Sequence, residues 1–345
     1  SMPCPATSSS CPIPRSARQT DLPMTLAIVW ICVGLAALIA GAELLVRSGS
    51  ALAARLGVSP LLIGLTVVAL GTSTPELAVG IDAAVQGNGS LAVGNIAGTN
   101  TVNILLILGL SAALRPLAIQ MQTLRLELPV IVIASATLLA FAWDGTLSRL
   151  EGLLLVTMGA AFTLAVIRVA RQESIKVKLE FAREYGPRRL ANRQAATEML
   201  MLAAGLVIIV AGADWLVEGA VGLARLWRVS DAFIGLTIVA IGTSAPELVT
   251  TIISTFRGER DIAIGNLIGS SVYNILVILG VTCLIPADGI DVNTHLIGID
   301  IPVMLGVALF CIPVFVSGRK ITRGEGGLFV SAYVAYLSYL IIQRA

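Results

Sequence analysis

Two glutamates stand in the middle of long apolar runs, each directly after a proline and three residues after a Thr-Ser pair. Glu76 ends the segment GTSTPE (residues 71–76), and Glu247 ends GTSAPE (residues 242–247). A carboxylate at the centre of a membrane helix costs about 2.5–3.5 kcal/mol to insert, so it is a candidate functional group. Carboxylate, hydroxyl and carbonyl oxygens are the ligands that hard cations prefer. The two segments therefore predict a cation site within a membrane.

Each segment is also predicted to interrupt a helix. A proline lacks the N–H donor and clashes with the carbonyl one turn earlier, and the preceding glycine loosens the same stretch. The break is expected to free carbonyls at membrane depth, where irregular backbone is tolerated only inside protein or beside a water-filled cavity. The alternative for each single hydroxyl is a bond back to its own helix. The candidate ligands are Glu76, Glu247, Thr72, Ser73, Thr243, Ser244 and the carbonyls of Ala69 and Ala240.

A second polar motif follows each of these segments. It reads GNIAGTNTVN at residues 94–103 and GNLIGSSVYN at residues 265–274. Thr99 and Asn103 are four residues apart and share a helical face, as do Ser270 and Asn274. The small residues Gly94, Gly98, Gly265 and Gly269 allow close helix approach, which would bring these faces against the broken helices. Interhelical hydrogen bonding alone is the alternative, although an asparagine carbonyl also ligates hard cations.

The two pairs of motifs belong to an internal repeat. Adding 171 to a residue number maps 34–110 onto 205–281 without a gap, and 35 of the 77 paired residues are identical. The repeat unit contains five predicted spans. Because five is odd, the second copy enters the membrane from the opposite side, which makes the two copies inverted repeats. Such repeats are typical of transporters, with the substrate site near the midplane where the repeats meet.

The composition requires a membrane protein. The chain is 56% hydrophobic and 13% charged, with a mean hydropathy of +0.90, whereas soluble domains carry about 25% charged residues. These values exclude a water-soluble enzyme and a nucleic-acid-binding protein. We expect an all-α polytopic membrane protein of ten transmembrane helices, arranged as two inverted five-helix repeats. The predicted spans are 24–46, 60–86, 91–114, 127–143, 150–170, 198–221, 232–256, 262–285, 296–316 and 327–342.

The distribution of positive charge predicts the orientation. Residues 168–197 hold eight Lys and Arg, which places this connection in the cytoplasm by the positive-inside rule. Both termini then lie outside the cell membrane, with 17 of the 23 Lys and Arg on the inner side. The expected organisation is a disordered extension (1–23), a first repeat (24–170), a basic cytoplasmic linker (171–197) and a second repeat (198–345). Met24, at the start of the first span, is a candidate natural start.

The identity of the ion follows from the available ligands. If the two breaks meet at the pseudo-two-fold axis, Glu76 and Glu247 face one another, and their repulsion requires a cation or a proton between them. Calcium takes six to eight oxygen ligands at 2.3–2.6 Å. His295 is the single histidine and no CxxC pair exists, which disfavours zinc and copper. A hydrolase is disfavoured because no base accompanies Ser73 or Ser244.

Five further acidic residues lie within or beside the predicted spans. Glu43 and Asp214 occupy equivalent positions of the two copies, whereas Asp82 pairs with an isoleucine. Glu127 and Asp300 lie near span ends or beside a proline. We expect structural or gate-lining roles for all five.

The motifs at 71–76, 94–103, 242–247 and 265–274 closely resemble the two alpha-repeats of the cation/calcium exchanger superfamily, in particular of the prokaryotic sodium/calcium antiporters. The resemblance covers residues 24–345. It implies a ten-helix fold and the exchange of cytosolic calcium for external sodium, both as transported ions, without a cofactor. Glu76 and Glu247 would be the principal carboxylates. The remaining ligands would be Thr72, Ser73, Thr243, Ser244, the carbonyls of Ala69 and Ala240, and Thr99, Asn103, Ser270 and Asn274.

The resemblance also implies that the first and sixth helices form the moving gate. One departure concerns potassium: several relatives carry an aspartate where this chain has Asn274, so potassium co-transport is disfavoured here. The connection 168–197 is too short for the regulatory calcium-binding loop of animal exchangers. Proton/calcium exchange through the same two glutamates remains the alternative within transport. An ion channel, which would show flux without counter-ion coupling, is the alternative from another class.

Overall fold

A computed structural model describes residues 24–56, 58–185, 192–227, 229 and 240–344. Eight helices in this part are long and apolar enough to cross a membrane, and the bent pair Pro60–Thr72 and Thr74–Val85 adds a ninth. These positions match all the predicted spans except the seventh, 232–256, whose first half lies outside the described residues. The predicted disordered extension, 1–23, lies outside them as well.

The chain is built almost entirely from helices. The first half contains α1 (Met24–Leu56), α2 (Pro60–Ile63), η1 (Gly64–Val68), α3 (Ala69–Thr72), α4 (Thr74–Val85), α5 (Gly89–Thr101), η2 (Val102–Leu108), α6 (Gly109–Leu114), β1 (Leu117–Ala118), η3 (Thr123–Glu127), α7 (Leu128–Phe141), η4 (Ala142–Asp144), β2 (Thr146–Leu147) and α8 (Arg149–Tyr185). The second half contains α9 (Asn192–Leu226), α11 (Ala240–Thr243), α12 (Ala245–Arg257), α13 (Arg260–Tyr273), η6 (Asn274–Leu279), α14 (Gly280–Leu284), β3 (Ile290–Asp291), η7 (Leu296–Asp300), α15 (Ile301–Val316), β4 (Lys320–Ile321) and α16 (Arg323–Arg344). Helices α8 and α9 thus continue into the linker predicted at 171–197.

Both predicted helix breaks are present. The first broken helix bends by 41° between α3 and α4, where Ser73 leaves the helical region with ψ at 12°. Ser244 has nearly the same backbone conformation, with ψ at 5°, between α11 and α12. Pro75 and Pro246 lie in the first turn of the helix that follows each break. Proline suits this place because a first-turn N–H has no partner within the helix.

The two small sheets pair the halves of the chain reciprocally. Strand β1 pairs antiparallel with β4, with Leu117 opposite Ile321. Strand β2 pairs antiparallel with β3, with Leu147 opposite Ile290. Each half therefore contributes its earlier strand to one sheet and its later strand to the other.

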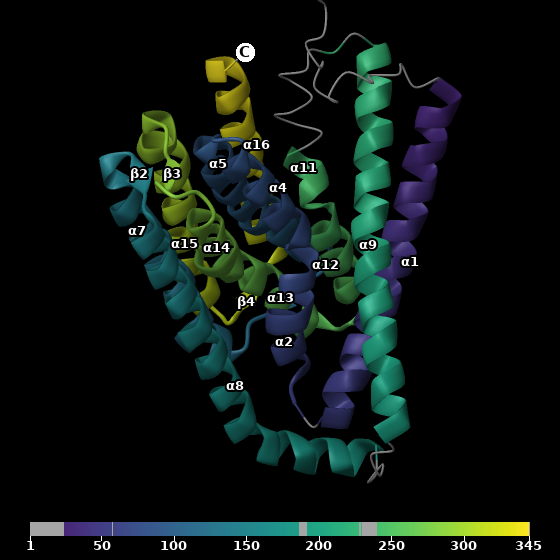
Figure 1. The fold of residues 1–345 in the computed structure, drawn as a ribbon. Helices are drawn as coiled ribbons and strands as arrows, with labels where there is room; N and C mark the ends of the chain where they lie inside the picture. Colours follow the sequence, from purple (N-terminus) through teal and green to yellow (C-terminus); the bar gives the residue numbers. More distant parts are fainter. Residues whose placement is uncertain (1–23, 57, 186–191, 228, 230–239, 345) are drawn as a thin grey trace, which may run out of the picture.

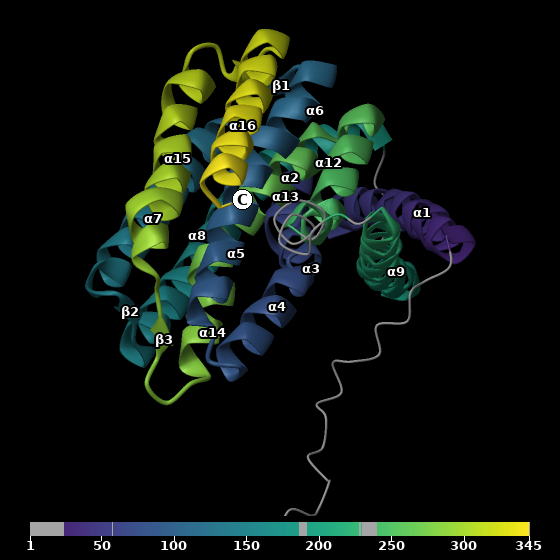
Figure 2. The ribbon, with the colours of Figure 1, turned by 90° about the horizontal axis from the view of Figure 1, so that it is seen from above.

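Helices α1 and α9 form an antiparallel pair through glycines. A Cβ atom added at Gly34 would lie 2.7 Å from the carbonyl oxygen of Gly212, and one at Gly41 would lie 3.0 Å from that of Gly205. Gly34 and Gly41 are the repeat equivalents of Gly205 and Gly212, so each glycine contacts the equivalent of the other. The pair stands at one side of the bundle in two perpendicular views (Figures 1 and 2).

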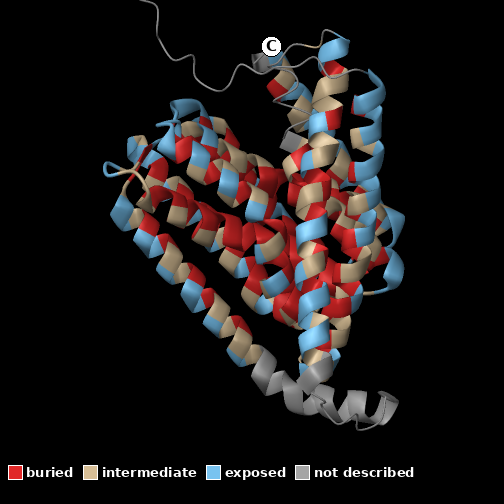
Figure 3. Ribbon diagram, turned by 45° about the vertical axis from the view of Figure 1, so that its right-hand side comes forward, coloured by how far each residue is buried: buried red, intermediate tan, exposed pale blue. Residues whose placement is uncertain are grey.

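The helices that carry the second polar motif lie at the centre of the molecule. The most apolar windows of Gly89–Leu114 and Arg260–Leu284 are 78% and 83% buried, against 22% for α1 and 28% for α9. Buried residues accordingly concentrate inside the bundle (Figure 3), whereas the described side chains of α1, α8 and α9 are mostly intermediate or exposed. Large apolar side chains such as Val29, Leu153 and Val207 are exposed on these outer helices, as expected of surfaces that face lipid.

Candidate cation site

The structure brings the two glutamates together. Glu76 lies in the first turn of α4 and Glu247 in the first turn of α12, and both side chains are fully buried. They are close enough to interact electrostatically. Ser73 Oγ, from the first break, donates to Glu247 Oε1 at 3.3 Å. The first broken helix therefore contacts the carboxylate of the second directly.

Hydroxyl groups from two helices surround Glu247. Besides Ser73, the hydroxyls of Thr72 and Ser270 lie near this carboxylate. Thr72 Oγ1 also lies 3.1 Å from Asn266 Oδ1 and 3.4 Å from the Ala69 carbonyl. Because a hydroxyl carries a single proton, Thr72 can donate to one of these two acceptors at a time.

Glu76 has a different environment. Within the described part of the chain, neither of its carboxylate oxygens has a hydrogen-bond partner, although both are buried. The same holds for Glu247 Oε2 and Ser244 Oγ. Buried polar atoms are nearly always paired with protein, water or an ion. This group of unpaired oxygens is therefore suited to a bound cation.

The asparagines of the second motif are fully buried. Asn103 lies in η2 and Asn274 begins η6, so both stand in π-helical segments, which occur frequently at functional sites. Neither Asn103 polar atom has a partner among the described residues, nor does Asn274 Oδ1. No hydrogen bond in the described structure joins Asn103, Asn274, Thr99 or Ser244 to either glutamate. Thr99 is buried, and Thr243 is half-buried.

The glycines of the second copy have the role predicted for them. A Cβ atom added at Gly265 would lie 2.8 Å from the Leu61 carbonyl oxygen, and one at Gly269 would lie 2.7 Å from that of Leu65. Helix α13 thus lies directly against the first broken helix. Ser270, next to Gly269, consequently reaches the Ala69 carbonyl at 3.3 Å. The equivalent contact for Gly98 would involve residue 236, outside the described residues. Among the described residues, a Cβ atom added at Gly94 would meet the Leu296 side chain at 3.4 Å.

One expectation about the first break is wrong. The Ala69 carbonyl still accepts the backbone N–H of Ser73 at 3.1 Å, so the break does not free it from the helix. Pro75 removes the donor that would reach the carbonyl four residues earlier, at Gly71. That carbonyl accepts the Thr74 hydroxyl at 2.7 Å instead. Ala240 begins α11, but its surroundings lie outside what the structure describes.

Asn266 and Asn100 belong to the polar interior but were absent from the predicted ligand set. Asn266 accepts from Thr72 and donates to Thr251 Oγ1 at 3.4 Å, and Asn100 contacts Asn274. Asn266 lies four residues before Ser270, so the helical face it shares with this predicted ligand could have indicated it.

The other acidic residues lie apart from the glutamates. Glu43 forms an ion pair with Arg257, which connects α1 to α12. Asp82 accepts from Gln86, buried Glu127 accepts from Gln122, and Asp300 accepts from the Tyr336 hydroxyl at 2.7 Å. These contacts fit the structural roles predicted for them. Asp214 is exposed on α9.

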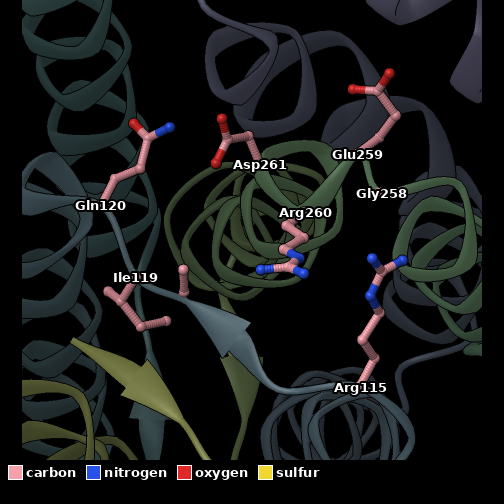
Figure 4. Close-up of a pocket in the computed structure, with 8 residues that line it drawn as sticks. Arg115, Ile119, Gln120, Gly258, Glu259, Arg260 and Asp261 are labelled. Carbon is pink, nitrogen blue, oxygen red and sulfur yellow. The ribbon is translucent and has the colours of Figure 1, made fainter. Parts of the chain in front are cut away.

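A separate hollow of about 350 Å³ lies beside the turn between α12 and α13. Arg115 and Arg260 extend into it, and Gln120, Glu259 and Asp261 lie around it (Figure 4). Its two arginines and two acids balance in charge, and it contains none of the predicted cation ligands.

Comparison with known proteins identifies the family. Residues 26–168 and 197–342 match the family described as sodium/calcium exchanger protein. The chain is 36% identical to inner membrane protein YrbG of Escherichia coli over 92% of its length and 97% of that protein. It is 31% identical to sodium/calcium exchanger MaX1 of Methanosarcina acetivorans, over 92% of this chain and 99% of the other.

A solved structure shares the fold. The sodium/calcium exchanger from Methanococcus jannaschii superimposes with a TM-score of 0.77 at 26% identity, covering 91% of this chain and 98% of the other. The two matching segments and the coverage of these relatives over nearly their whole length show the family. This multi-pass membrane protein belongs to the sodium/calcium exchanger family, a family of transporters rather than enzymes.

Proposed function

We propose that the chain is a secondary antiporter that exchanges calcium for sodium across the cell membrane by alternating access. The observation that carries this proposal is the meeting of Glu76 and Glu247, from the first turns of two broken helices, in a fully buried and oxygen-rich interior. The sodium/calcium exchanger names of two relatives support the choice of ions.

The proposed ions fit the ligands. Among the described residues, no group of three or more His, Cys, Asp and Glu could hold a metal, so a site here must combine two carboxylates with neutral oxygens. Such a set suits calcium and sodium, which accept carbonyl and hydroxyl oxygens. The proposed ligands are those of the sequence analysis: Glu76, Glu247, Thr72, Ser73, Thr243, Ser244, Thr99, Asn103, Ser270, Asn274, and Ala69 and Ala240 through their carbonyls.

The architecture we propose is two inverted repeats of five membrane helices, 24–170 and 198–345, joined by 171–197. Reciprocal contacts support it. In the α1–α9 pair each glycine contacts the equivalent of the other, and the strands pair as β1 with β4 and β2 with β3. A self-complementary contact of this kind is the signature of two-fold symmetry.

We further propose that the basic connection is cytoplasmic and that both termini lie outside, in the cell membrane. The excess of Lys and Arg on one side supports this orientation, and one relative is named an inner membrane protein.

Coupling would follow from the charge of the site. Two buried carboxylates without a counter-charge cost several kcal/mol each. The protein should therefore not change between the two orientations of alternating access while its site is empty. Calcium or sodium would supply that charge, and α1 with α9 would move as the gate. The peripheral position of this pair, held by glycine contacts, supports such a motion (Figure 2).

Proton/calcium exchange is the second candidate, and one observation favours it. The Glu76 carboxylate has no hydrogen-bond donor among the described residues, so a proton could occupy it in place of sodium. Uptake that persists after the sodium gradient is abolished, while a pH gradient is kept, would establish this alternative.

The test is radioactive calcium uptake into proteoliposomes loaded with sodium. Wild type should take up calcium when diluted into sodium-free buffer, and Glu76→Gln and Glu247→Gln should each reduce uptake to background. Asp288→Asn, an exposed carboxylate between α14 and β3, is the matched control and should retain wild-type uptake. Unchanged uptake in either glutamate variant would refute the site.

A further inference from the structure

Asn100 takes part in a chain of hydrogen bonds where the two copies of the second motif cross. Its Nδ2 donates to the Ser271 carbonyl oxygen at 2.9 Å, and its Oδ1 accepts from Asn274 Nδ2 at 3.1 Å. All three residues are fully buried. Asn100 and Ser271 are repeat equivalents, 171 positions apart, so this contact lies where the symmetry relates the two halves.

The chemistry of these groups determines which way each amide points. A backbone carbonyl can only accept, so Asn100 must turn its NH₂ group toward Ser271. The carbonyl oxygen of Asn100 then faces Asn274, which must donate to it through its own NH₂ group. Asn274 Oδ1 consequently points away from Asn100, and it is buried without a partner among the described residues.

We infer that Asn100 is a positioning residue, which holds Asn274 with its carbonyl oxygen, and not its NH₂ group, available to the transported cation. This inference rests on the proposed function. An amide that turned around would present two N–H donors to a cation, and a ligand would be replaced by a repulsive group. Fixing the amide before the ion arrives removes that unproductive orientation, which is the general benefit of preorganisation.

Within the described structure, the first copy of the motif, residues 94–103, lacks a hydrogen bond that orients its asparagine in this way. The equivalent of Asn100 is Ser271, whose hydroxyl donates back to the Leu267 carbonyl at 2.9 Å. Asn103, the equivalent of Asn274, has no partner for either amide atom among the described residues. Asn274 is therefore oriented in advance and Asn103 is not, although the two asparagines occupy the same position of the motif.

The experiment measures the calcium KM and maximal rate of sodium-driven uptake in proteoliposomes. Asn100→Ala should raise the KM about tenfold, as expected for one lost hydrogen bond in a buried site, with little change in maximal rate. Asn100→Leu keeps the branched shape but removes both hydrogen-bonding atoms, and it should raise the KM in the same way. Ser271→Ala keeps the backbone carbonyl and is the matched control, with an unchanged KM.

A second background separates positioning from packing. Asn274→Asp offers oxygen in either orientation, so adding Asn100→Ala to it should not raise the KM further. An equal rise in both backgrounds, or no rise in the wild-type background, would overturn the inference. Wild-type protein that takes up no calcium would instead overturn the proposed function, so the two failures are distinguishable.

Discussion

At the scale of single residues, the two glutamates are equivalent in sequence but differ in their surroundings. Glu247 accepts a hydrogen bond from Ser73 and has the hydroxyls of Thr72 and Ser270 nearby. Glu76 has no hydrogen-bond donor within the described part of the chain. The difference arises from the hydroxyls, because Ser244, the counterpart of Ser73, donates to no described residue. The site is thus asymmetric despite the repeat.

This asymmetry predicts different effects for two matched alanine variants. Ser73→Ala removes a donor from a buried carboxylate and should destabilise the cation-free protein by about 1–3 kcal/mol, whereas Ser244→Ala should change its stability by less than about 0.5 kcal/mol. Thermal unfolding in detergent, without sodium or calcium, measures both. Equal losses of stability would show that the hydrogen bond to Glu247 does not distinguish the two halves.

At the scale of elements, the close crossing of α13 over the first broken helix positions the ligands. Gly265 and Gly269 let the backbones touch, and that contact brings Ser270 to Ala69 and Asn266 to Thr72. A larger residue at either glycine would push the two ligand-bearing elements apart.

Gly269→Val is therefore expected to reduce both folding and transport. Its side chain would overlap the Leu65 carbonyl oxygen, and overpacking typically costs about 1–3 kcal/mol. The yield of monodisperse protein and the calcium uptake per folded molecule measure the two effects. Gly306→Ala is the control, because an added Cβ atom there meets no atom of the described residues within 4 Å. If Gly269→Val transported as well as Gly306→Ala, close helix approach would not be needed.

At the scale of the whole molecule, an ion pair between described residues connects α1 to the rest of the bundle. Arg257 on α12 pairs with Glu43 on α1. Their repeat equivalents are Gln86 and Asp214, which cannot form the same ion pair. This ion pair therefore has no counterpart at the equivalent positions of the other half, and it would stabilise one orientation of the proposed gate over the other.

The strength of this pair limits its effect on transport. The side chains are 49% and 29% exposed, and a partly exposed pair contributes about 0.2–1 kcal/mol. Arg257→Gln should therefore change the uptake rate by no more than about fivefold. Glu43→Gln should give a similar change, and the double variant no larger one. Abolished uptake in Arg257→Gln alone would mean that Arg257 does more than hold α1.

The sequence predicted most of this arrangement because both halves carry the same signals. Apolar lengths located the helices, and the repeated proline–glutamate segments located both breaks and their acidic residues. The position of the free carbonyl was mistaken at Ala69, since the missing donor of Pro75 affects Gly71. Asn100 was missed because its counterpart is Ser271, so comparing the two copies hides it. Residue spacing alone also does not reveal where an α-helix becomes a π-helix, as happens at Asn103 and Asn274.

The most direct test of the account is to locate the bound ion. In crystals of the protein soaked with strontium, a heavier substitute for calcium, anomalous scattering should show one ion coordinated by oxygens of both Glu76 and Glu247, at distances close to the 2.3–2.6 Å of calcium sites. Replacing either glutamate by glutamine should remove that signal. An ion that binds away from this pair, or that contacts only one of the two carboxylates, would contradict the account.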